Sequence, residues 1–152
     1  MEIITVSRNI PFPGSCVILV ISKKSEKETS DINNLLFFPT RLEFQIPNSE
    51  DEDKIYNDVV TVINNSIGTD YIKIKEKIET LWEKTSWNND NKSLIEIWRY
   101  NNNQTNFFFI FLANYTDSIS QVRDITKEIL KKTDFFPNGG IPWGTPANTY
   151  HI

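Results

Sequence analysis

Residues 93–113 read SLIEIWRYNNNQTNFFFIFLA, two apolar stretches separated by a short polar run rich in asparagine. The arms are rich in β-branched and aromatic residues, which favour strands, and a short polar run between two such arms is typical of a turn. We therefore predict a β-hairpin with its turn near Asn102. The second arm is apolar on both faces, which predicts a central strand with Phe109 and Phe111 buried.

The first third of the chain contributes three more predicted strands. Residues 2–7 form a short β-branched segment, and residues 16–21 form a continuous apolar run typical of a strand buried on both faces. Residues 41–46 alternate between apolar and polar side chains, the pattern of a strand with one buried face. Because Cys16 opens the second of these strands, we expect its thiol to be buried and unreactive.

Three helices are predicted from apolar residues that recur every three or four positions. The first begins with Ser49 and Glu52, which fit a capping box, and ends at Gly68. The second has its apolar stripe between Tyr71 and Trp82, with lysine and glutamate on its outer face. The third begins near Ser118, with Gln121 in the position of a capping box.

The C-terminal residues, 135–152, contain three prolines, and proline has no backbone N–H to give to a sheet ladder. They also contain Trp143 and other large side chains that a disordered tail would normally lack. We therefore expect an ordered but irregular tail packed on the domain formed by residues 1–134, with Trp143 as a structural peg in preference to a partner anchor. The predicted fold class is α+β: a five-stranded, mainly antiparallel sheet with three helices largely on one face.

Composition limits the classes of function. The chain has 152 residues, a net charge of −4 and one cysteine, which fits a single globular domain without disulfides. The negative charge argues against nucleic acid held on a basic face and favours a basic protein partner. No signal peptide is recognised, and the longest apolar runs are too short to span a bilayer. We expect a cytoplasmic protein without a membrane partner.

The residues needed for common chemistries are absent or scattered. His151 is the only histidine, so a catalytic triad or a histidine metal site would depend on the penultimate residue. Glycine-rich phosphate loops are missing, and the acidic residues 50–53 lack the spacing of a calcium loop. The sequence therefore predicts no catalytic residues, no metal and no cofactor.

Charged and aromatic residues within the strands are the candidate site. Glu43 and Glu96 interrupt apolar strands, as do Arg41 and Arg99, and in neighbouring strands these residues would form a charge ladder on the open face. Aromatic residues and arginine are enriched at binding hot spots. The candidate partner-binding residues are Glu43, Glu96, Trp98, Arg99, Tyr100 and Trp143.

Three functions are compatible with these observations. The one we favour is a small acidic protein that binds and neutralises a protein partner, as inhibitors and immunity proteins do. The first alternative is a small enzyme that uses scattered carboxylate, tyrosine and lysine groups. The second is a sheet that binds single-stranded RNA. The partner's identity and the oligomeric state stay open.

Overall fold

A computed structural model describes residues 2–23, 38–90, 92–101, 106–113, 115, 117–133 and 147–151. The elements along the chain are β1 (Glu2–Asn9), β2 (Cys16–Lys23), β3 (Phe38–Gln45), α2 (Ser49–Ser66), β4 (Ile72–Ile78), β5 (Trp82–Asn89), β6 (Lys92–Asn101), β7 (Asn106–Leu112), α3 (Ile119–Lys132) and β8 (Ala147–His151). The strands form one sheet in the order β4-β5-β6-β7-β3-β2-β1-β8, and every neighbouring pair is antiparallel.

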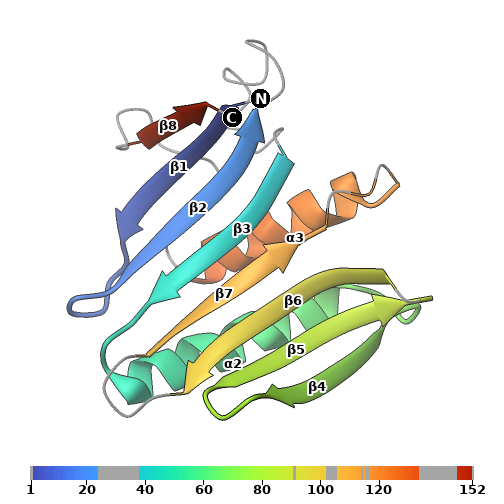
Figure 1. Ribbon diagram of the computed structural model, residues 1–152, viewed down its shortest axis with the longest axis horizontal. Helices are drawn as coiled ribbons and strands as arrows, with labels where there is room; N and C mark the ends of the chain where they lie inside the picture. The colour runs from blue at the N-terminus through green and yellow to red at the C-terminus, as the bar shows by residue number, and fades with distance from the viewer. Residues whose placement is uncertain are drawn as a thin grey trace.

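Figure 1 shows both helices on one side of the sheet, with α3 behind β3 and β7 and α2 behind β7 and β6. The prediction of five strands and three helices was wrong. The sheet contains seven strands from β1 to β7, extended by the short β8 at the β1 edge, and the described residues contain two helices.

The predicted second helix is replaced by the hairpin of β4 and β5. The sequence of β4, IKIKEKI, alternates with a period of two, and Ile72, Ile74 and Ile78 lie on one face of the strand. The turns at both ends of β5 contain a residue with positive φ, Glu79 at 56° and Asp90 at 45°. The helical spacing of the apolar residues in this segment competes with the alternation, and the alternation determines the structure.

The pairing of the two arms of residues 93–113 was predicted correctly, since β6 and β7 pair from Ile95 with Leu112 to Asn101 with Asn106. The turn predicted near Asn102 lies outside the described residues. The strand β7 is central, as expected. Its two faces differ, however: Phe108 is fully buried, whereas Phe111 is 39% exposed.

The first and third predicted helices are confirmed as α2 and α3, but neither has the predicted capping box. Asn48 is the N-cap of α2, where its side chain accepts hydrogen bonds from the backbone N–H groups of Glu50 and Asp51. At α3, Ser118 makes no side-chain capping bond. Gln121 instead donates to the carbonyl of Ile67 at 2.8 Å, which ties α3 to the end of α2.

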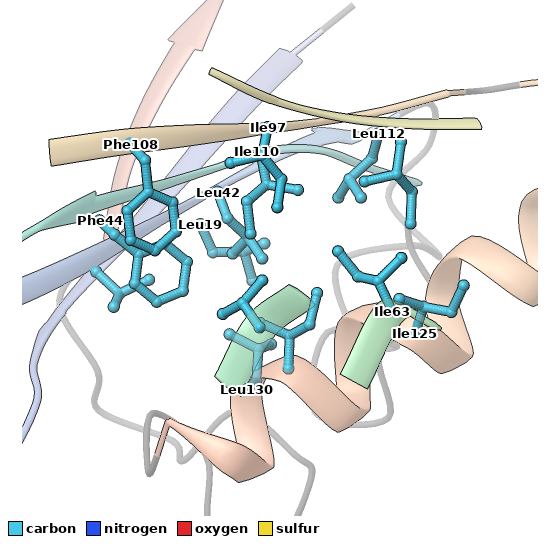
Figure 2. Close-up of a cluster of buried hydrophobic side chains, with 14 of the residues drawn as sticks. Leu19, Leu42, Phe44, Ile63, Ile97, Phe108, Ile110, Leu112, Ile125 and Leu130 are labelled. Atoms are coloured by element: carbon cyan, nitrogen blue, oxygen red, sulfur yellow. The ribbon is translucent and has the colours of Figure 1, made fainter. Parts of the chain in front are cut away.

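The core fills the space between the sheet and the two helices (Figure 2). Apolar side chains of β2, β3, β6 and β7 point toward the helices, among them Leu19, Leu42, Ile97 and Ile110. The helices contribute Ile63, Ile125 and Leu130, which are all buried.

The tail differs from the expectation that it makes no regular ladder. Residues 147–151 form β8 and pair with β1, with Ala147 opposite Val6 and His151 opposite Glu2. The three prolines precede this strand, so none of them removes an N–H group from it. Trp143 lies outside the described residues.

Candidate functional site: the open face of the sheet

The open face is the side of the sheet turned away from α2 and α3. Strand alternation places Trp98 and Tyr100 of β6 on this face, while Ile97, which precedes Trp98, packs in the core. The same alternation along β5 and β7 gives the open face six aromatic rings. We call this group the aromatic face: Trp82, Trp98, Tyr100, Phe107, Phe109 and Phe111.

The rings of the aromatic face pack against one another. Trp82 is the central member, with ring centroids 5.0 Å from Tyr100 and 6.0 Å from Phe109. Tyr100 stacks on Phe107 at 4.8 Å, and Phe109 meets Phe111 at 6.2 Å. Such ring pairs add to the stability gained from area burial. No described helix or strand covers these rings, and Phe111 is the most exposed of them.

A shallow concavity of about 430 Å³ lies within the aromatic face. Its walls are Trp82, Trp98, Phe109 and Phe111, and Glu96 is the one charged residue among the described residues that line it. The indole Nε1 of Trp98 donates to Oε1 of Glu96 at 3.0 Å, so the carboxylate and the ring hold each other in place.

Two cations lie beside these rings on the same face. The Lys84 ammonium is 5.5 Å from the Trp98 ring centroid and forms an ion pair with Glu76 at 3.2 Å. The Arg41 guanidinium is 5.9 Å from the Phe109 centroid. Both distances lie within the range of cation–π attraction.

The predicted charge ladder was wrong. The strand β7 lies between β3 and β6, so Glu43 faces Phe109 and Glu96 faces Phe111. Glu43 and Glu96 share the open face without being cross-strand neighbours.

Arg99 lies on the other side of the sheet. It follows Trp98 directly, so its side chain points toward α2. Its guanidinium makes two 2.7 Å hydrogen bonds to the buried carboxylate of Glu52 and a third bond to Asp53. The group also lies 4.2 Å from the ring centroid of Tyr56. Burial acts to lower the pKa of Arg99, but the hydrogen bonds and charges of the two carboxylates outweigh it and raise the pKa.

Arg99 and Tyr100 also border a second cavity, of about 410 Å³, at the start of α2. The remaining residues that line it are Ser49, Glu50, Glu52, Asp53 and Glu83. Among the described residues, no group of three or more histidine, cysteine, aspartate or glutamate side chains is placed to hold a metal ion.

The prediction that the Cys16 thiol is buried was wrong. Its side chain is half-buried on the open face, where the thiol lies 3.8 Å from Oε1 of Gln45. Burial, reinforced by the Glu43 carboxylate, raises the pKa of the Cys16 thiol. Cys16 pairs with Asn9 at one end of β1. His151 pairs with the residue at the other end of β1, so the two backbone positions are on the order of 20 Å apart.

Of the six candidate residues, Glu43, Glu96, Trp98 and Tyr100 share the open face. Arg99 belongs to the opposite face, and Trp143 lies outside the described residues. Trp82 is not among the residues predicted for the site, because helical spacing assigned it to a helix, and Phe109 and Phe111 were predicted to lie in the core. The alternation of β4 indicates a strand up to Ile78, but the sequence of β5, WEKTSWNN, has no such alternation that would place Trp82 on a face.

Comparison with known proteins adds no assignment: no family model, no curated protein and no solved structure matches the chain. In the part of the chain that the structure describes, no helix is long and apolar enough to cross a membrane.

Proposed function

We propose that this protein acts by binding another protein through its aromatic face, without catalysing a reaction. The supporting observation is the packing of six aromatic rings on a sheet face that no described element covers. Aromatic residues are enriched in protein interfaces and at hot spots, and a large exposed apolar patch on a monomer marks an interaction site.

Charge favours a basic partner. The chain carries a net charge of −4. The open face itself carries Glu43, Glu76 and Glu96 against Arg41 and Lys84. An acidic protein that covers a basic partner would neutralise it, as small inhibitors and immunity proteins do. We place this activity in the cytoplasm, because a chain with one cysteine suits a reducing compartment.

Single-stranded RNA is the second candidate ligand. Exposed aromatic rings on an antiparallel sheet stack unpaired bases, and Arg41 and Lys84 lie beside the rings. The negative net charge acts against this use, because phosphate contacts supply much of the affinity for nucleic acid.

The proposal is tested by affinity capture with three baits: the wild type, Phe111→Glu and Tyr115→Glu. Phe111 and Tyr115 are similarly exposed, at 39% and 36%, but Tyr115 follows β7 and contacts Lys92. We expect a protein retained by the wild type and by Tyr115→Glu but lost with Phe111→Glu. Equal retention by all three baits would contradict the proposal. Retention of nuclease-sensitive RNA in place of a protein would establish the second candidate.

A further inference from the structure

We infer that the concavity within the aromatic face receives an arginine side chain of the protein partner. The inference rests on the proposed function and names the chemical group that the site recognises. The concavity offers the faces and edges of four aromatic rings and one carboxylate, that of Glu96. Aromatic faces attract cations through the ring quadrupole, and a nearby carboxylate supplies the opposite full charge.

The Glu96 carboxylate is oriented but not neutralised by its contacts. Its Oε1 accepts a hydrogen bond from the Trp98 indole, and no described residue donates to its Oε2. The ion pairs among the described residues do not include Glu96. A carboxylate in an apolar wall with an acceptor oxygen to spare attracts a cationic donor.

The opposite face of the same sheet shows how such a group is bound when it is present. There, Arg99 lies over the ring of Tyr56 and makes two hydrogen bonds to Glu52. The concavity repeats the aromatic ring and the carboxylate, as Trp98 and Glu96, but the described residues that line it include no arginine.

The cations already on this face do not fill the concavity. Lys84 and Arg41 contact rings of the aromatic face, yet neither residue lines the concavity. The Lys84 charge is also offset by Glu76. Among the described residues, the open face carries three carboxylates and two cations, and this net negative charge suits one more cation.

Arginine fits this site better than lysine does. A guanidinium is planar, stacks on aromatic rings and is weakly hydrated, whereas an ammonium is compact and strongly hydrated. The walls offer few acceptors besides Glu96, so an entering cation has to give up water without much replacement.

The test uses N-acetyl-arginine methylamide as the probe and the neutral isostere N-acetyl-citrulline methylamide as its control. Binding is followed by the NMR signal of the Trp98 indole N–H, which lies at the site. We expect a saturable shift with the arginine probe and binding about tenfold weaker with the citrulline and lysine counterparts. Glu96→Gln should weaken arginine binding by about tenfold, whereas Glu128→Gln, on α3 and away from the open face, should leave it unchanged.

Equal binding of arginine and citrulline, tighter binding of lysine, or no saturable shift would each overturn the inference. The proposed function is tested independently of this inference, by the partner that the capture experiment identifies. If a captured partner depends on Phe111 but binds the wild type and Glu96→Gln equally, the function stands and the inference is lost. If no partner depends on Phe111, the function itself is wrong whatever the probe does.

Discussion

Arg99 shows that the face of a strand on which a side chain lies determines whether it belongs to the candidate binding surface or supports the fold. Its neighbours Trp98 and Tyr100 lie on the open face, while Arg99 joins β6 to the first turn of α2. The composition of the segment predicted a binding surface that includes Trp98 and Tyr100, which lie together on the open face. The same composition also led to the inclusion of Arg99, although strand alternation places Arg99 on the opposite face of the sheet from Trp98 and Tyr100.

Removal of Arg99 should destabilise the fold. Arg99→Met leaves the carboxylate of Glu52, whose side chain is 4% exposed, without its partner. Breaking a buried ion pair in this way costs about 3–5 kcal/mol. Urea unfolding of Arg99→Met and of the double variant Arg99→Met/Glu52→Leu is the measurement. The double variant should be the more stable of the two, and a single variant as stable as the wild type would contradict the structural role.

Cys16 should react slowly with a maleimide at neutral pH, and faster as the pH rises. The thiolate is the reactive form, and the raised pKa of the half-buried thiol lowers the thiolate fraction. Since this pKa is higher in the folded than in the unfolded chain, its contribution to stability is present below the unfolded pKa and is lost as the pH rises through the folded pKa. Stopped-flow labelling of folded and urea-unfolded protein is the comparison. A folded rate at pH 7 equal to the unfolded rate would show that the thiol is not protected.

At the scale of elements, the sequence predicted the helices and strands whose apolar residues fit only one type of secondary structure. The hairpin of β6 and β7 and the helices α2 and α3 are where the pattern placed them. Residues 70–82 fit both the strand pattern and the helix pattern. Lysine and isoleucine alternate, as in a strand, while the large apolar side chains also recur at helical spacing. Pairing with β6 gives β5 long-range contacts that local spacing does not encode.

The two faces of β7 should differ in their effect on stability. Phe108 is fully buried, with its ring 4.6 Å from Phe44 and 5.7 Å from Tyr56, so Phe108→Ala should cost ~3–5 kcal/mol. Phe111→Ala, at a 39% exposed position, should cost about 1 kcal/mol or less. Chemical unfolding of the two variants side by side measures the difference, and equal losses would mean that the open face is part of the core.

At the scale of the whole molecule, the fold is a long antiparallel sheet with helices on one side and aromatic rings on the other. The sequence predicted Glu96, Trp98 and Tyr100 as candidate site residues, because a carboxylate interrupts the apolar strand and aromatic residues accompany arginine there. It did not predict that Trp82 would complete the site, since this contact depends on the pairing of β5 with β6. Three-dimensional neighbours on separate strands carry no signal in a single sequence.

Association with a basic partner should slow as salt is added. The net charge of −4 steers an oppositely charged protein, and salt screens this attraction. We expect the association rate to fall between about 0.05 M and about 0.5 M salt, where the screening length shortens severalfold. Stopped-flow association at several salt concentrations measures it. A rate that does not change with salt would remove the electrostatic part of the proposal, and a rate that increases would indicate an acidic partner.

The affinity of the captured partner for the wild type, Phe111→Glu and Tyr115→Glu tests the binding role of the aromatic face most directly. Titration calorimetry gives the three dissociation constants, and thermal melting of each variant shows that the fold is intact. A charge placed among the rings should weaken binding by tenfold or more, about 1.4 kcal/mol, without unfolding the protein, whereas Tyr115→Glu should bind like the wild type. A Phe111→Glu variant that stays folded and binds as tightly as the wild type would contradict the account.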